Sequence, residues 1–164
     1  MDEPELRIRR RNLPHWTMDG STYFVTFRLG KGTLSAAERK IVIDHLKAGH
    51  GKFYRMAAAV VMPDHVHLLL CPESGFDLSR IMKGIKGVSA RKINQSRGRT
   101  GTIWQDESWG RIIRDADEFG EKLQYMADNP LKARLVESID EYDGWICNLD
   151  EQAQTGMSVP PEES

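Results

Sequence analysis

The sequence has few of the features that would place it in a membrane or in an oxidising compartment. Its two cysteines, Cys71 and Cys147, lie far apart and form no CxxC motif, which indicates incidental thiols in a reducing environment. No apolar run approaches the roughly 20 residues of a membrane span. The N-terminal stretch MDEPELRIRRRNLPHW has no apolar segment of the kind a secretory signal needs. We therefore expect a cytoplasmic protein without membrane association.

The sequence also lacks internal repeats and phosphate-cradling loops. Its glycine-containing stretch GRTG, residues 98–101, is not followed by the GK[ST] of a nucleotide-binding loop. We therefore expect residues 98–101 to be a loop and not a phosphate-binding motif.

Basic residues are missing from the C-terminal part of the chain. Residues 137–164 carry eight acidic groups and no Lys or Arg, whereas residues 1–136 hold all 23 basic groups and only 16 acidic ones. The formal net charge of −1 therefore conceals a basic body followed by an acidic tail. Such charge serves solubility in many proteins. Whether it also binds a polyanion depends on where the basic residues lie along the chain.

A chain of 164 residues suits one domain with a real core. We expect a single domain over residues 1–150, in which residues 1–20 form a basic arm. Residues 151–164 are polar and acidic and are expected to be disordered.

Hydrophobic periodicity predicts an α+β protein. Apolar alternation and turn residues predict strands, and 3.6-residue periodicity with capping signals predicts helices. The expected strands span 21–30, 53–62 and 65–72, the expected helices span 34–50, 76–97 and 115–129, and 102–115 is expected to be an irregular strand pair. The order suggests an antiparallel sheet with helices on one face, which is compatible with a ferredoxin-like sandwich without fixing that topology.

Two histidines interrupt the apolar run VVMPDHVHLLL, residues 60–70. Because side chains alternate along a strand, His65 and His67 share one face with Cα atoms about 6.5–7 Å apart. Two imidazoles at that spacing can converge on one metal ion. The alternative is a pair of core histidines bonded to backbone or carboxylate groups. The HxH pattern alone does not separate the two.

The last predicted helix carries a tyrosine away from its apolar face. Phe119, Leu123, Met126 and Ala127 form one stripe, and Tyr125 projects from the other side. Asn129 lies four residues later, so a phenol and an amide oxygen share a face, and an amide oxygen is a reasonable ligand for a hard divalent ion. A surface tyrosine without chemical function remains the alternative. Asn129-Pro130 is expected to end the helix.

MPDHVHLLL followed at long range by YMADNPLKARLV resembles the single-tyrosine HUH transposase family, and within it the REP-associated tyrosine transposases. The segments RRRNLPHW, GSTYFVTFRL and IWQDESWGRIIRD resemble the same branch, so the similarity covers about residues 7–147. Relatives often have Gly where this chain has Arg134, a difference that bears on the turn after the helix.

The resemblance implies specific roles. His65 and His67 match two metal-ligating histidines, Asn129 matches the third ligand, and Tyr125 matches the catalytic nucleophile. The family fold is a ferredoxin-like sandwich with this tyrosine on a C-terminal helix. Its members use Mg²⁺ or Mn²⁺ to cut single-stranded DNA, often beside a hairpin, and form a 5′-phosphotyrosine. Monomers and homodimers both occur, so oligomeric state stays open.

Basic residues gather on the predicted helix 76–97 and on the arm. We expect both segments to contact DNA backbone, which would give salt-dependent binding. A solvated helix face and a solubilising arm are the alternatives. The expected DNA-binding residues are Arg80, Lys83, Lys86, Arg91 and Lys92 on the helix, and Arg9, Arg10 and Arg11 on the arm.

Four tryptophans, Trp16, Trp104, Trp109 and Trp145, are candidates for stacking on unpaired bases, although tryptophans more often pack in a core. Two other functions stay open at this point. One is a DNA-binding protein of the same fold without cleavage, and the other is a metal-dependent hydrolase of small phosphoesters.

Overall fold

The structure of the protein is a computed structural model that describes residues 20–149. Within this range an antiparallel sheet of five strands packs with three α-helices and one short 3₁₀ helix. In chain order the elements are β1 (Tyr23–Leu29), α2 (Ala36–Gly49), β2 (Tyr54–Val61), β3 (His65–Pro72), α3 (Leu78–Arg97), β4 (Trp104–Ile112), α4 (Ala116–Lys132), η2 (Ile139–Glu141) and β5 (Trp145–Cys147).

The strand order in the sheet is β4-β1-β3-β2-β5. Each neighbouring pair is antiparallel, and the first four strands follow the order of the ferredoxin-like plan. This confirms the predicted α+β class and settles the topology that the sequence left open. β3 lies at the centre of the sheet, so its side chains have covered neighbours on both sides.

Local sequence signals explain the helix ends. In α2 the Ser35 hydroxyl accepts from the Glu38 amide at 3.1 Å, and the Glu38 carboxylate accepts from the Ser35 amide at 2.9 Å. This is the predicted capping box, which satisfies donors at the first turn. α3 begins after Asp77, whose side chain accepts from the Arg80 amide, and ends at Gly98 with a left-handed φ of 67°.

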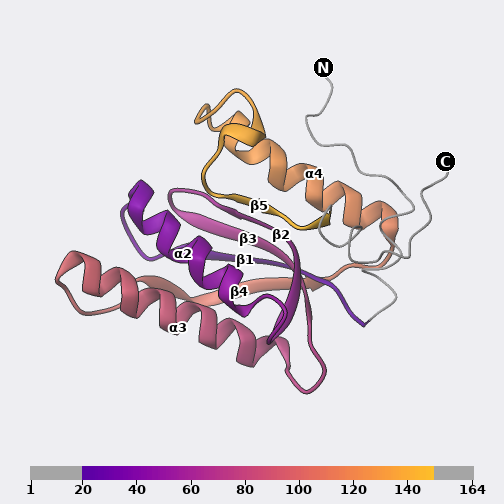
Figure 1. The fold of residues 1–164 in the computed structure, drawn as a ribbon, viewed down its shortest axis with the longest axis horizontal. Coiled ribbons are helices and arrows are strands. Elements are labelled where there is room, and N and C mark those ends of the chain that lie inside the picture. Colours follow the sequence, from indigo (N-terminus) through magenta and orange to yellow (C-terminus); the bar gives the residue numbers. More distant parts are fainter. Residues whose placement is uncertain (1–19, 150–164) are drawn as a thin grey trace.

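Helices cover both faces of the sheet (Figure 1). α2 and α3 pack on one face, as expected, but α4 packs on the other, so the expectation of helices on one face was wrong for α4. The physical reason is that the central strands are apolar on both faces: Val25 and Phe27 point towards α2 and α3, whereas Phe24 and Leu69 point towards α4. Each face therefore needs a cover.

Two segments differ from their predicted form. Residues 104–112 form one strand rather than an irregular pair, because β4 pairs only with β1 at the edge of the sheet, where polar side chains remain in water. Helix α4 continues through Pro130 to Lys132. Proline disfavours a helical conformation in the residue before it without forbidding it, and here only one further turn follows.

The predicted basic arm with Arg9, Arg10 and Arg11 and the acidic tail 151–164 lie outside the described residues. Within 20–149, none of the helices combines the length and the apolar character needed to cross a bilayer.

Candidate metal and tyrosine site

The two histidines of β3 face α4 and lie close together. A tight turn at Pro63-Asp64 joins β2 to β3, closed by the bond from the Met62 amide to the His65 carbonyl at 2.8 Å. Strand alternation then places His65 and His67 on one face, and their ring centroids are 4.8 Å apart. His67 is 3% exposed and His65 is half-buried. The pair is therefore buried at His67 and partly accessible to solvent at His65.

Each imidazole has a hydrogen-bond partner at Nδ1. His67 Nδ1 lies 2.7 Å from Thr26 Oγ1 on β1, and His65 Nδ1 lies 2.7 Å from Asp64 Oδ1. Among the described residues, His67 Nε2 is buried without a partner. Polar partners at one ring nitrogen fix the orientation of an imidazole whose other nitrogen binds a metal. A buried nitrogen that lacks a partner is what such a ligand would show before the ion binds.

His67 is held in its neutral form. Burial is the main cause, followed by the nearby His65, Arg28 and Lys122, and together they lower its pKa to about 3. Neutral imidazole is the form that coordinates metal ions. Two cations lie near this site: Arg28 is the strand partner of His65, and the Lys122 ammonium lies over the Phe24 ring.

Helix α4 brings Tyr125 to the histidines of the same chain. Its apolar stripe, Phe119, Leu123, Met126 and Ala127, is buried against the sheet as predicted. Tyr125 stays 48% exposed, with its ring centroid 5.4 Å from that of His67. The Phe24 ring lies beneath both, stacked on His67 at 5.3 Å and edge-on to Tyr125 at 6.2 Å. The three predicted residues therefore meet on one surface.

Asn129 lies one helical turn after Tyr125 and is half-buried. Within residues 20–149, no group of three or more His, Cys, Asp or Glu side chains is arranged to hold a metal ion. A metal site here would therefore rely on the two imidazoles and an oxygen of another kind. The Asn129 amide oxygen is a donor that hard divalent ions such as Mg²⁺ accept, whereas imidazole nitrogens also suit softer metals, so this donor set does not select one divalent ion.

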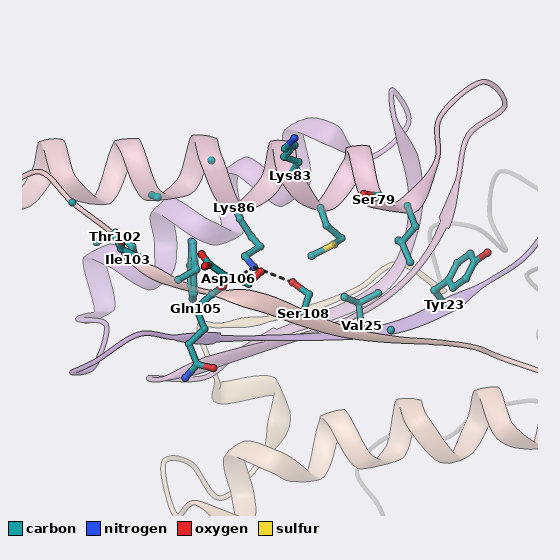
Figure 2. Close-up of a pocket in the computed structure, with 17 residues that line it drawn as sticks. Tyr23, Val25, Ser79, Lys83, Lys86, Thr102, Ile103, Gln105, Asp106 and Ser108 are labelled. Atoms are coloured by element: carbon teal, nitrogen blue, oxygen red, sulfur yellow. Dashed lines mark hydrogen bonds between the residues drawn. The ribbon is translucent and has the colours of Figure 1, made fainter.

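The predicted DNA-binding cations of α3 lie across the sheet from this site. α3 packs on the face opposite α4, and a groove of about 850 Å³ runs between α3 and β4. Figure 2 shows the Lys86 side chain spanning this groove, where its ammonium donates to the carbonyls of Gln105 and Asp106 at 2.7 and 3.0 Å and to Ser108 Oγ at 3.1 Å. Lys86 thus holds strand to helix. Arg80, Lys83, Arg91 and Lys92 remain exposed.

Several residues at the site were not predicted. Thr26, Phe24 and Arg28 alternate on β1 and reach the site because Thr26 pairs with His67 and Arg28 with His65. Lys122 lies on α4 one turn before Tyr125, with its Nζ 5.1 Å from the Phe24 ring centroid. Strand alternation in β1 was visible in the sequence, but the register that brings Thr26 to His67 was not.

Comparison with known proteins gives a consistent set of similarities. A family model described as IS200-like transposase matches residues 39–113. A protein described as a candidate REP-associated tyrosine transposase of Haemophilus influenzae is 27% identical over 99 residues, which are 54% of this chain and 56% of that protein. The REP-associated tyrosine transposase of Escherichia coli is 24% identical over 127 residues, 75% of this chain and 74% of that protein. The chain thus aligns with little more than half of the first relative.

The fold is similar to a solved structure of a REP-associated tyrosine transposase bound to a REP hairpin. The TM-score is 0.61 at 21% identity, with 100% of this chain and 92% of that chain covered. At this identity the likeness concerns the fold. Together with the family model and the two sequence relatives, it agrees with the predicted resemblance: the chain is similar to the IS200-like transposases and, among them, to REP-associated tyrosine transposases.

Proposed function

We propose that the protein is a metal-dependent single-stranded DNA endonuclease and strand transferase that acts through a covalent 5′-phosphotyrosine. The main support is the placement of Tyr125 beside the histidine pair, with 5.4 Å between the Tyr125 and His67 rings. Similarity to transposases alone would allow an inactive protein. A nucleophile next to two potential metal ligands, all in one chain, favours an active one.

The proposed reaction exchanges one phosphoester for another. The Tyr125 oxygen attacks a phosphorus of the DNA backbone, a new bond forms between that oxygen and the phosphorus, and the bond to the 3′ oxygen breaks. The phenol loses its proton, and the departing strand leaves as a 3′-hydroxyl that gains one. Because the phosphoester is retained, a 3′-hydroxyl can reverse the step and join strands. The 48% exposure of Tyr125 leaves room for a strand to approach.

His65, His67 and Asn129 would hold the divalent ion. When bound, Mg²⁺ or Mn²⁺ would supply positive charge to the phosphoryl oxygens and orient the scissile group. Thr26 and Asp64 orient the imidazoles, and the burial that keeps His67 neutral keeps it ready to coordinate. Phe24 supports the His67 and Tyr125 rings from below.

The proposed substrate is hairpin or palindromic single-stranded DNA in the cytoplasm. The solved relative is bound to a REP hairpin, and the basic residues of this chain suit a polyanion. One chain supplies both histidines and the tyrosine, so the proposal works for a monomer and does not require a homodimer. The exposed cations of α3 would contact parts of the DNA beyond the cleaved strand.

Trapping the covalent complex tests this proposal. The protein is incubated with end-labelled hairpin DNA carrying single-stranded flanks and Mn²⁺, and adducts are separated on a denaturing gel. We expect an adduct with the wild type and none with Tyr125→Phe or without metal. Binding on a native gel without any adduct would favour the alternative of a DNA-binding protein that lacks cleavage. Cleavage that survives Tyr125→Phe would favour a hydrolase in which the tyrosine has no role.

A further inference from the structure

One tryptophan differs from the others that the structure describes. Trp104 is 4% exposed and donates from Nε1 to Ser89 at 2.9 Å, and Trp145 packs against the core cluster under α4. Trp109 on β4 is 48% exposed. An exposed indole at the edge of a sheet contributes little to the core. Whether it can bind a ligand depends on where it lies relative to the histidines and Tyr125.

Trp109 lies on the same face of the sheet as the histidines and close to them. It is the Cα partner of Thr26 on β1, and Thr26 is the Cα partner of His67 on β3. The three residues therefore form a row across adjacent strands. Two strand spacings separate the backbone of Trp109 from that of His67, which is a distance of about 10 Å. A strand of DNA held at His67 would have a neighbouring nucleotide within reach of the indole.

Two cations flank this row. Arg28 is the Cα partner of His65, and Lys122 lies above Phe24 next to Tyr125. Within residues 20–149 neither forms a salt bridge, whereas Arg111 on the same face is paired with Glu118. The surface formed by Arg28, Trp109 and Lys122, here called the β4 platform, thus combines an exposed ring with two cations. That combination is typical of surfaces that bind unpaired nucleotides.

We infer that the β4 platform binds the unpaired nucleotides next to the scissile phosphate, with Trp109 stacked on one base and Arg28 and Lys122 against the backbone. This inference rests on the proposed function and adds to it the path of the DNA strand. It is compatible with the expectation that the cations of α3 contact DNA backbone, because the sheet separates α3 from Tyr125 and leaves those cations to other parts of the DNA. The groove beside α3 is crossed by Lys86, whose ammonium is bonded to β4.

A binding cycle with abasic DNA tests the stacking. Affinities are measured by fluorescence anisotropy in the Tyr125→Phe background, using a hairpin with single-stranded flanks in which each flank or loop position is made abasic in turn. Stacking contributes about 1–3 kcal/mol per base, so we expect Trp109→Ala to weaken binding of intact DNA about 5- to 150-fold. On DNA that is abasic at the one flank position where the indole stacks, Trp109→Ala should cause no further loss of affinity. Trp109→Phe should restore part of the affinity for intact DNA.

Ile112 provides the matched control. It is 47% exposed on the same strand, but it lies three residues from Trp109 and thus on the other face. Ile112→Ala should leave affinity unchanged. The inference is overturned if Trp109→Ala binds like Ile112→Ala, or if its loss is the same at every abasic position. The inference is also overturned if the effect of Trp109→Ala disappears when a hairpin-loop position is abasic, because the indole would then contact the hairpin and not the flank.

The cations are tested by salt dependence. Each phosphate contact contributes about 0.7 to the slope of log affinity against log salt for single strands, so Arg28→Ala and Lys122→Ala should each reduce that slope by nearly one contact. Lys47→Ala, at an exposed position on α2, is the control, and Lys83→Ala reports on α3. The same slopes are then measured with the single-stranded flank alone as the ligand. If Lys83→Ala reduces the slope and neither Arg28→Ala nor Lys122→Ala does, the strand binds on the other face of the sheet. These binding results do not depend on cleavage. If the wild type forms no adduct, the proposed function is contradicted. A loss of the Trp109→Ala effect on DNA abasic at one flank position would still support the β4 platform.

Discussion

Thr26 and His67 face each other across β1 and β3, and Thr26 Oγ1 lies 2.7 Å from His67 Nδ1. The hydroxyl is positioned to hold the imidazole with Nε2 directed into the site, where that atom is buried without a partner among the described residues. A threonine with no ligand atom of its own thereby determines which nitrogen of His67 is available to a metal ion. Residues in this supporting position affect metal affinity almost as strongly as the ligands do.

Replacing Thr26 should therefore weaken metal binding. Thr26→Val keeps the shape of the side chain and removes the hydroxyl, so we expect the affinity for Mn²⁺ to fall about 10- to 100-fold. The measurement is calorimetric titration of the DNA-free protein with Mn²⁺. Thr26→Ser keeps the hydroxyl and should bind like the wild type, whereas His67→Ala gives the value for a lost ligand. Equal Mn²⁺ affinity in Thr26→Val and wild type would mean that the hydroxyl does not orient the imidazole.

Acid should loosen the attachment of the tyrosine helix through Glu118. This carboxylate accepts from the Arg114 amide at 2.9 Å and pairs with Arg114 and with Arg111 of β4. The backbone bond from Arg114 is the largest cause that lowers its pKa to about 2 from the usual 4.5. A lowered pKa means that the folded state favours the carboxylate, so its contribution is complete above pH 4.5 and is lost as the pH falls through about 2.

Denaturant unfolding of Glu118→Gln at pH 7, 4, 3 and 2 tests this linkage. The variant should be less stable than the wild type at pH 7, and the difference should shrink as the pH falls, because the wild-type carboxylate then becomes protonated. Glu121→Gln, an exposed position on the same helix, should show no such convergence. A stability difference that is constant from pH 7 to pH 2 would contradict the assigned role of the Glu118 carboxylate.

Lys86 should matter for stability more than its exposed neighbour Lys83. The Lys86 ammonium lies within 3.4 Å of three carbonyls and one hydroxyl of β4 and donates to them, and burial lowers the pKa of this lysine. Hydrogen bonds from a charged donor contribute more than neutral ones, although partial exposure reduces the effect. We expect Lys86→Ala to lower the free energy of unfolding by about 1 kcal/mol and Lys83→Ala to leave it nearly unchanged. Urea unfolding of both variants measures the difference, and equal values would show that the contacts of Lys86 with β4 do not stabilise the fold.

The residues of the site show what the sequence could and could not predict. Strand alternation placed His65 and His67 on one face, and helical periodicity placed Tyr125 off the buried stripe, because both patterns are local. The meeting of that tyrosine with the histidines was supplied by the family resemblance, because it depends on which face α4 covers. Thr26 and Trp109 became visible only with the strand register, which is a property of the tertiary structure.

Lys86 shows what a count of basic residues in the sequence does not predict. In the sequence, the five basic side chains of α3 that we expect to bind DNA are equivalent, but a count does not show whether an ammonium contacts water, a carbonyl or a carboxylate. The structure ties Lys86 to β4 and pairs Arg97 with Glu38 of α2 at 2.8 Å. The sequence therefore predicted the basic character of the helix but not these tertiary contacts, and DNA binding by its cations stays a prediction.

The turn after α4 carries a strain that one substitution should relieve. The Leu135 amide donates to the Pro130 carbonyl and the Arg134 amide to the Leu131 carbonyl, both near 3 Å, which is the Schellman pattern at a helix C-terminus. The residue that adopts the left-handed conformation in this pattern is usually glycine, and here it is Arg134 with φ of 61°. Side chains with a Cβ are disfavoured in that region by roughly 1–2 kcal/mol.

Arg134→Gly should therefore raise the stability of the protein. The greater freedom of glycine in the unfolded chain offsets part of the gain, so we expect a net increase of about 0.5–1 kcal/mol and a rise of about 1–4 °C in Tm. The matched control is Arg91→Gly at an exposed position within α3, where glycine should cost about 1 kcal/mol because the backbone is already helical. Opposite signs for the two arginine-to-glycine changes would show that backbone conformation, and not loss of the guanidinium charge, sets the result. If Arg134→Gly is also destabilising, then the arginine side chain must contribute more to the folded state than its strained backbone costs.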